Sequence, residues 1–235
     1  METVTILLLA YNEAETIETE IAAWKKITET LKNVRSEIVI VEDGSTDGTT
    51  QILQRQMEGG FIKHLHSPVR AGYKSALMRG LKEAKSDYVF MSDTGLKNEL
   101  SDFYKFWNLR KQCDLLVGHK IARSDSYFRR LMTYTFNLYL RILFWDSALK
   151  DTDCGFRLLN QNFYNFVSRR GLKFKEFANT EMTLVAREKF TFIQMPISYK
   201  GRRGESRGLP PKKIPKAIFG VVRDIQSFKK NITLK

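Results

Sequence analysis

The first half of the chain alternates short apolar runs with segments whose apolar residues recur at helical spacing. Continuous apolar runs are typical of strands that are buried on both faces of a sheet. Five strands are predicted, at Val4–Ala10, Glu37–Val41, Phe61–His66, Asp87–Met91 and Asp114–Gly118. Four helices are predicted between them, at Ala14–Leu31, Thr49–Met57, Ala71–Ala84 and Phe103–Cys113. This order favours an α/β fold, in which a mostly parallel sheet is flanked by helices on both faces.

The second half of the chain is richer in helical and aromatic patterns. The spacing predicts a long aromatic helix or helix pair at Tyr127–Leu149, a short helix from Gln161, a helix at Phe177–Lys189, a strand at Phe190–Tyr199 and an amphipathic, basic helix at Ile214–Lys230. We expect one domain in two halves, 1–118 and 119–209, followed by the C-terminal amphipathic helix, 210–235. The longest apolar stretch is interrupted by polar residues, so no membrane span is expected.

Charge separates the same two halves. The chain carries 39 Lys and Arg against 26 Asp and Glu, a net charge of +13. Residues 1–118 hold 15 basic and 17 acidic residues, whereas residues 119–235 hold 24 and 9. The positive excess therefore lies in the second half and indicates an acidic partner there: nucleic acid, a phosphorylated ligand or an anionic membrane. Nucleic acid is the weakest of these, because no RNA-binding aromatic motif or DNA-reading helix is recognisable.

Cysteine and histidine are scarce. Two cysteines cannot make a disulfide scaffold or a four-cysteine zinc site. The three histidines do not form a histidine-rich metal motif. His64 and His66 alternate at the end of a predicted strand, and we interpret them as surface residues.

Polar residues follow three of the predicted strands at the point where each one ends. These are Asn12-Glu13, Glu42-Asp43 and Ser92-Asp93. Because ligands of parallel sheets collect beyond the carboxyl ends of the strands, the three acidic clusters are expected to converge. The glycine fingerprints of dinucleotide and P-loop sites are absent from the sequence. Carboxylates instead suit hydrogen bonds from a nucleobase or ribose, and the binding of Mg²⁺ or Mn²⁺ against a diphosphate.

Five segments then occur in the order found in a known family. They are Tyr11-Asn12-Glu13, VEDGSTDGT at 41–49, Asp87–Gly95, DTDCGFR at 151–157 and RRGES at 202–206. Together they resemble an inverting family-two glycosyltransferase of the GT-A (Rossmann-like) fold. The GFR segment and the arginine-rich glycine loop are similar to the dolichol-phosphate mannosyltransferase-like, or polyprenyl-phosphate glycosyltransferase, branch.

The resemblance implies a donor site. Tyr11, Glu13 and Asp43 would contact the base and ribose of the nucleotide, and Asp93 would bind Mg²⁺ or Mn²⁺ as the first Asp of the family's Asp-x-Asp motif. The second Asp of that motif is Gly95 here. The metal would then be held by Asp93 with diphosphate oxygens and water, or with help from Glu99, and a degenerate sugar-binding protein stays an alternative.

The resemblance also implies an acceptor site. Arg129, Arg130, Arg202 and Arg203 would lie at the acceptor phosphate, where guanidinium groups grip phosphate oxygens bidentately. Arg157 would be a further catalytic arginine near the phosphates. The other catalytic residues would be Asp93, Arg129 and Arg202. Asp151 and Glu181 are candidates for a base or a supporting residue. A purely structural role is the alternative for four aspartates, because simple turn and capping positions also suit Asp43, Asp47, Asp151 and Asp153.

The function implied is hexose transfer from UDP-glucose or GDP-mannose to a polyprenyl or dolichyl phosphate, with inversion. A glycan or soluble acceptor stays an alternative. The basic, aromatic second half suits docking on an anionic membrane, so we expect a peripheral enzyme on the cytoplasmic face. A separate membrane protein is a candidate partner.

Overall fold

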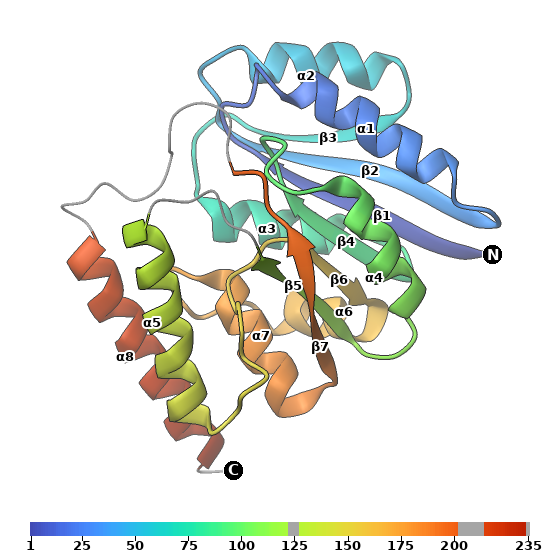
Figure 1. The fold of residues 1–235 in the computed structure, drawn as a ribbon. Coiled ribbons are helices and arrows are strands. Elements are labelled where there is room, and N and C mark those ends of the chain that lie inside the picture. Colours follow the sequence, from blue (N-terminus) through green and yellow to red (C-terminus); the bar gives the residue numbers. More distant parts are fainter. Residues whose placement is uncertain (122–126, 202–213, 234–235) are drawn as a thin grey trace.

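The computed structural model describes residues 1–121, 127–201 and 214–233 (Figure 1), with side chains at positions 128, 129, 214–218, 232 and 233 outside the description. A seven-stranded sheet with the order β3-β2-β1-β4-β6-β5-β7 forms its centre. The strands are β1 (Glu2–Ala10), β2 (Val34–Asp43), β3 (Ile62–Ser67), β4 (Tyr88–Asp93), β5 (Leu115–Ile121), β6 (Arg157–Asn160) and β7 (Phe192–Ser198). Only β6 runs antiparallel to its neighbours, β4 and β5, so the expected mostly parallel α/β sheet is confirmed.

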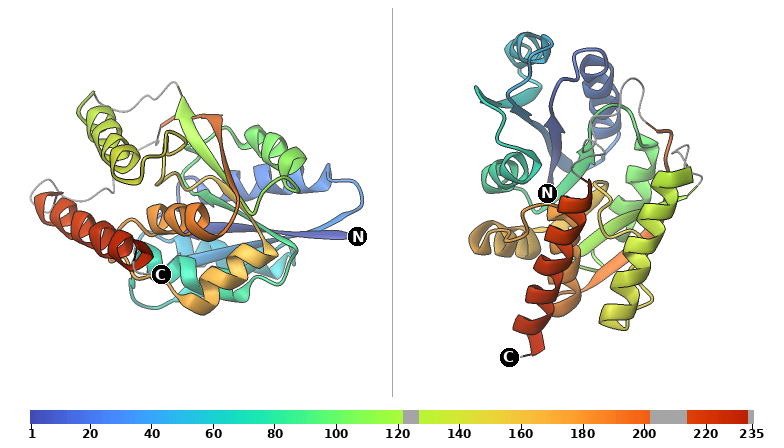
Figure 2. Two further views of the ribbon diagram at one scale, coloured as in Figure 1. Left: turned by 90° about the horizontal axis from the view of Figure 1, so that it is seen from below. Right: turned by 90° about the vertical axis from the view of Figure 1, so that its left-hand side faces the viewer.

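Helices cover both faces of this sheet. They are α1 (Ile17–Glu29), α2 (Thr49–Glu58), α3 (Tyr73–Glu83), α4 (Phe103–Leu109), α5 (Tyr127–Phe144), α6 (Gln161–Arg170), α7 (Ala178–Lys189) and α8 (Ile214–Thr233), with a short 3-10 turn, η1 (Leu100–Asp102). α1 and α4 lie on one face, and α3 and α6 lie on the other (Figure 2). The predicted strands and helices of the first half are all present, with shifted ends.

Two apolar clusters hold the layers together. In the larger one, the Phe90 ring on β4 is surrounded by Trp24, Phe103, Phe106 and Phe156, with ring centroids 4.7 to 5.7 Å away. All five side chains are fully buried, so they anchor α1 and α4 to the sheet by burial of large apolar surfaces.

The second cluster packs α5 and α8 against α7 (Figure 1), and its buried residues are Leu140, Phe144, Leu149, Phe174, Leu184, Val221 and Ile225. Lys229 of α8 also donates a hydrogen bond to the carbonyl oxygen of Leu143 at 2.6 Å. No described helix combines the length and the apolar character needed to cross a bilayer.

Two expectations about elements need correction. No strand is predicted at 157–160, yet these residues form β6 and separate β4 from β5. A four-residue strand is too short to show periodicity. The helix predicted to extend to Leu149 ends at Phe144, where Trp145 takes a left-handed φ of 51° and Asp146 donates its N–H to the Arg141 carbonyl. The predicted boundary after Gly118 stays a prediction, and Gly118 lies inside β5.

Candidate active site

The carboxyl ends of β1, β2 and β4 border one open cavity of about 230 Å³. Parallel pairing of β1 with both neighbours brings these ends to the same edge of the sheet. The residues lining the cavity are Leu9, Ala10, Tyr11, Glu13, Asp43, Arg70, Tyr73, Ala76, Asp93, Thr94 and Lys97. The expected convergence of the acidic strand ends is therefore confirmed for Glu13, Asp43 and Asp93, and Tyr11 joins them.

Tyr11 and Arg70 form one wall of the cavity. The guanidinium carbon of Arg70 lies 3.9 Å from the centroid of the Tyr11 ring, a cation–π contact. Gly44 leaves room for the backbone that carries Arg70, because a Cβ at position 44 would lie 2.5 Å from the Arg70 backbone nitrogen. The pair offers a flat cationic surface that suits a stacked base or a phosphate.

Asp43 occupies the end of β2 and braces the loop before α3. Its Oδ1 accepts the Ala71 N–H and its Oδ2 accepts the Gly72 N–H, both at 2.8 Å. Each carboxylate oxygen keeps lone-pair capacity for a further donor such as a ribose hydroxyl. Asp43 is therefore held rigidly at the cavity by the chain's own backbone.

Asp93 ends β4 and lies directly against Gly155. A Cβ at position 155 would lie 2.3 Å from the Asp93 Oδ1 atom, so only glycine fits beside this carboxylate in its present position. The charge of Asp93 also acts on Asp153, which lies in the same loop as Gly155. Desolvation raises the pKa of Asp153 to about 7, Arg157 opposes this rise, and the charges of Asp151 and Asp93 add to it. The 151–157 segment thus places Gly155 against Asp93 and a carboxyl group, Asp153, within its electrostatic influence.

A buried glutamate, Glu20, holds the loop after Asp93 in place. Glu20 Oε2 on α1 accepts the N–H groups of Gly95 and Leu96, at 2.8 and 3.3 Å. Gly95 has a left-handed φ of 94°, and a Cβ there would lie 3.2 Å from Glu13 Oε2. Desolvation raises the pKa of Glu20 to about 7. The position where the family motif has its second Asp is therefore a tightly supported turn beside Glu13.

Arg157 corrects an expectation. Its side chain is 0% exposed. It donates to the carbonyl oxygens of Cys154 and Thr152, at 2.5 and 2.6 Å, and to the Thr183 hydroxyl at 3.1 Å. A guanidinium that is buried and committed to the protein does not contact a substrate phosphate. Arg157 instead braces the loop that carries Asp151, Asp153 and Gly155.

The remaining predicted residues lie in several places. Arg202 and Arg203 fall outside the described residues, as does the side chain of Arg129, while Arg130 is exposed on α5. Asp151 is buried, and Lys120 donates its N–H to Asp151 Oδ2 at 3.5 Å.

Two glutamates are engaged with protein partners. Glu181 is fully buried and accepts bonds from the Arg170 guanidinium and from the backbone N–H groups of Lys173 and Phe174, each at 2.7 Å. This is the geometry of a supporting residue. Glu99 pairs with Lys200 at 2.6 Å, and this lysine lowers the pKa of Glu99.

Sequence reasoning missed Arg70, Tyr73 and Lys97, which line the same cavity. Arg70 follows β3, so the strand-end argument that found Asp43 and Asp93 also applies to it. No sequence pattern indicates the role of Glu20, because it lies on the first turn of a helix among other glutamates.

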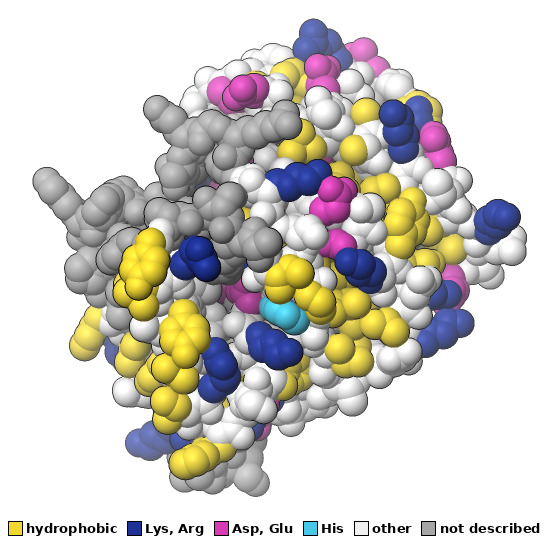
Figure 3. Space-filling view, in the orientation of Figure 1, with side chains coloured by type: hydrophobic (Ala, Val, Ile, Leu, Met, Phe, Trp, Pro, Cys, Tyr) yellow, Lys and Arg dark blue, Asp and Glu magenta, His cyan; other side chains and the backbone are white. Residues whose placement is uncertain are grey.

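One face of the molecule carries apolar side chains interspersed with basic ones over α5 (Figure 3). The exposed apolar residues of α5 and its flank are Tyr127, Leu131, Tyr134, Ile142 and Trp145. Trp145 is 90% exposed, and Phe219 on α8 is 74% exposed.

Comparison with known proteins gives a consistent result. The family model described as glycosyl transferase family 2 matches residues 5–176. The chain is 27% identical over 206 residues to glycosyltransferase AglD of Haloferax volcanii, covering 84% of this chain and 33% of that protein. It is 34% identical over 129 residues to poly-beta-1,6-N-acetyl-D-glucosamine synthase of Staphylococcus aureus (strain COL), covering 54% and 30%. The chain thus spans about a third of the length of these relatives.

Solved structures with a similar fold include glucosyl-3-phosphoglycerate synthase from Mycobacterium tuberculosis. In its complex with Mn²⁺, UDP and glucosyl-3-phosphoglycerate, the TM-score is 0.70 at 18% identity, covering 96% of this chain and 79% of that one. A second complex, with Mn²⁺, UDP-glucose and glycerol 3-phosphate, gives a TM-score of 0.69. At this identity the likeness concerns the fold.

Proposed function

The chain belongs to glycosyltransferase family 2, and from this premise we propose that it moves a hexose from a nucleotide diphosphate sugar to a polyprenyl phosphate with inversion. The donor is of the UDP-glucose or GDP-mannose type. The observation that carries the proposal is the cavity that gathers Tyr11, Glu13, Asp43 and Asp93 at the strand ends. This edge is where ligands of open α/β sheets bind.

Each of these residues has a defined task in the proposal. The Tyr11–Arg70 wall stacks on the base, and Asp43 and Glu13 accept hydrogen bonds from the base or the ribose hydroxyls. Asp43 is already fixed by two backbone N–H groups, so binding does not have to order it. Lys97 places a positive charge on the same cavity, where a diphosphate would lie.

The donor atoms around Asp93 fit Mg²⁺ or Mn²⁺. Both ions prefer carboxylate oxygens, and the carboxylates of Asp93 and Glu13 line the same cavity. Asp93 would hold the ion, with diphosphate oxygens and water as further ligands. A bound ion of this kind neutralises charge on the diphosphate leaving group.

A phosphate acceptor simplifies the chemistry asked of the protein. A phosphate monoester is anionic at neutral pH, so its oxygen attacks the anomeric carbon without a strong general base. Catalysis then rests on positioning and on stabilising the departing diphosphate. Asp151 and Glu181 need not act as bases, which agrees with their burial and with the bonds that Glu181 makes within the protein.

The exposed face over α5 and α8 supports a lipid acceptor and a peripheral position on the cytoplasmic side of the membrane. Tyr134 and Trp145 at α5 and Phe219 on α8 are 57%, 90% and 74% exposed. Basic side chains lie among the apolar residues over α5 (Figure 3). Aromatic side chains insert at the headgroup level while Lys and Arg attract anionic lipid. A membrane-protein partner would meet the chain on the same face.

A soluble phosphorylated acceptor is the second candidate. It is favoured by the structural similarity to a synthase whose solved complexes hold phosphoglyceric acid and glycerol 3-phosphate. Both candidate acceptors present the same phosphate oxygen, so they differ in what surrounds the phosphate.

A transfer assay with labelled donor separates these candidates. The protein is incubated with UDP-[¹⁴C]glucose or GDP-[¹⁴C]mannose, Mn²⁺, and either polyprenyl phosphate in anionic vesicles or 3-phosphoglycerate. The proposal predicts label in the organic-solvent extract, abolished in Asp93→Asn and retained in Glu58→Gln, an exposed carboxylate on α2. Label only in a water-soluble product would establish the second candidate, and no transfer with any donor would reject both.

A further inference from the structure

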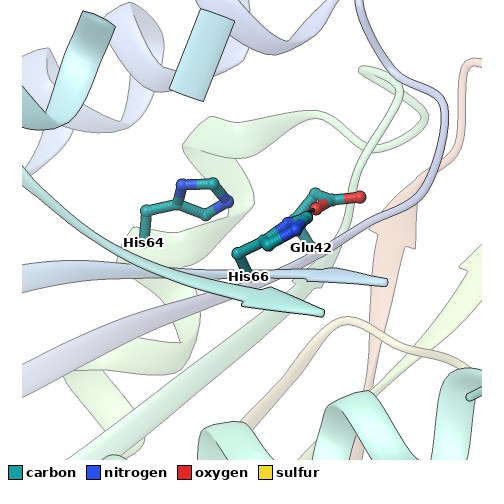
Figure 4. A group of neighbouring side chains, drawn as sticks. All are labelled: Glu42, His64 and His66. Carbon is teal, nitrogen blue, oxygen red and sulfur yellow. Dashed lines mark hydrogen bonds and ion pairs between the residues drawn. The ribbon is translucent and has the colours of Figure 1, made fainter. Parts of the chain in front are cut away.

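Glu42, His64 and His66 form a cluster on the edge of the sheet, outside the cavity described above. Glu42 lies on β2 directly opposite His66 of β3, and His64 precedes His66 by two residues on the same face of β3. Figure 4 shows the three side chains facing one another above the two strands. Each offers one ligand atom, and these atoms all lie within 4.8 Å of one another.

His64 brings an unused ligand atom to this cluster. Its Nε2 atom is buried and has no hydrogen-bond partner among the described residues. Figure 4 shows a nitrogen of this ring turned toward Glu42 and His66. Buried polar atoms rarely lack a partner, and a metal ion would supply one here.

Glu42 and His66 complete the ligand set. Glu42 is fully buried, and its Oε2 accepts a bond from His66 Nδ1 at 2.5 Å. The His66 side chain is 42% exposed, which gives an ion a path from solvent. Arg79 fixes the strand by donating to the His66 carbonyl at 2.7 Å.

From this geometry we propose that Glu42, His64 and His66 bind a Zn²⁺ ion, with water completing the coordination. Two imidazoles and one carboxylate are a common zinc ligand set, and Mg²⁺ prefers oxygen ligands alone. Tetrahedral zinc with bonds of about 2.1 Å places its ligand atoms about 3.4 Å apart, so the His66 and Glu42 atoms have to separate while all three stay within the 4.8 Å that the cluster spans. If His66 binds through Nδ1, its proton moves to Nε2, so that the neutral ring donates its Nδ1 lone pair.

The proposed ion would act on the rim of the donor cavity. Glu42 immediately precedes Asp43, and its Oε1 accepts the backbone N–H of Ser45. Zinc on Glu42 would therefore fix the turn at 42–45 without entering the cavity, because neighbouring residues of a strand point to opposite faces. This site is independent of the acceptor and of the Mn²⁺ site at Asp93.

Histidine side-chain NMR tests the proposal directly, because the chain has only three histidines. ¹⁵N-labelled protein is titrated with ZnCl₂ while imidazole ¹H–¹⁵N correlations are recorded. We expect the His64 and His66 signals to shift and to saturate at one equivalent, while His119 stays in place. Movement of all three histidines together, or no movement of His64, would overturn the proposal.

Variants separate ligands from neighbours. His66→Ala changes an exposed side chain and is expected to fold, and it should weaken Zn²⁺ binding by roughly tenfold or more. His64→Gln and Glu42→Gln should do the same, and His119→Ala is the matched control with wild-type affinity. Zn²⁺ should also raise the melting temperature of the wild type but not of His66→Ala. Equal affinity in His66→Ala and wild type would contradict the site.

Discussion

The carboxylate of Asp93 rests against the Cα atom of Gly155, so closely that a Cβ there would lie 2.3 Å from Asp93 Oδ1. This contact joins the end of β4 to the loop that follows α5 in the chain. The first half of the protein supplies the carboxylate, and the second half sets its position.

Gly155→Ala should therefore disturb Asp93 more than the fold. The added methyl group has to push the carboxylate or the loop aside, and displacement by about 1 Å costs roughly 10²-fold in rate. We expect Mn²⁺-dependent donor turnover to fall by about that factor, with about 1–3 kcal/mol lost from the free energy of unfolding. Gly220→Ala, where no atom lies within 4 Å of the added Cβ, is the control. Unchanged turnover in Gly155→Ala would contradict a role for the Asp93–Gly155 contact in catalysis.

Gly95→Asp restores the second carboxylate of the family motif, yet it should not strengthen metal binding. Its φ of 94° is strained for any side chain, and the new Cβ would lie 3.2 Å from Glu13 Oε2. We expect a loss of stability of about 1–3 kcal/mol and no gain in Mn²⁺ affinity, by calorimetry. Gly60→Asp has the same left-handed backbone in open space and isolates the backbone cost. A tighter Mn²⁺ site in Gly95→Asp would refute this explanation of the motif.

Arg157→Met should show whether this arginine supports the loop or binds substrate. The change removes the Arg157 donor from the Cys154 carbonyl and the Thr183 hydroxyl, at about 1–3 kcal/mol each, and leaves the Thr152 carbonyl with the Thr183 hydroxyl as its donor. Urea unfolding should show a loss of about 3 kcal/mol or more, whereas Arg55→Met, an exposed arginine on α2, should be nearly neutral. A variant as stable as wild type but unable to bind the donor would favour a phosphate contact instead.

Glu20 makes stability depend on pH. Its folded pKa of about 7 lies above the ordinary value of 4.5, so the folded protein holds a proton that the unfolded chain lacks between these pH values. Stability from this group is full below pH 4.5 and is lost as pH rises through 7. Glu20→Gln does not titrate, so its stability relative to wild type should improve between pH 5 and pH 8 by on the order of 3 kcal/mol.

Urea unfolding at both pH values measures this difference, and the exposed Glu18→Gln on the same helix is the control. A gap between Glu20→Gln and wild type that stays constant with pH would contradict the assignment.

Much of the donor side could be predicted from the sequence, for a physical reason. Strand order and apolar runs locate the strand ends, and parallel pairing brings Glu13, Asp43 and Asp93 together whatever the details of packing. Glu20 could not be predicted, because its position under Gly95 depends on how α1 packs on the sheet.

The partners of Arg157 and the surroundings of His64 depend on tertiary packing, which the sequence pattern does not indicate. The burial of the motif arginine Arg157 could not be predicted, since a charged residue two positions after Gly155 gives no sign that its partners are backbone carbonyls. Of the two histidines expected at the surface, His66 is exposed and His64 is half-buried. Their proximity to Glu42 could not be predicted, because it depends on the register that brings Glu42 of the neighbouring strand opposite His66.

Binding of nucleotide diphosphates by calorimetry, in the presence of Mn²⁺, tests the central claim most directly. We predict that UDP or GDP binds one site on the wild-type protein, and that Asp43→Asn and Asp93→Asn each weaken it by roughly tenfold or more, since each removes a charge-assisted contact of about 1.5–3 kcal/mol. Glu58→Gln should bind as wild type does. Binding of neither nucleotide, or equal affinity in the wild type and both aspartate variants, would contradict the account.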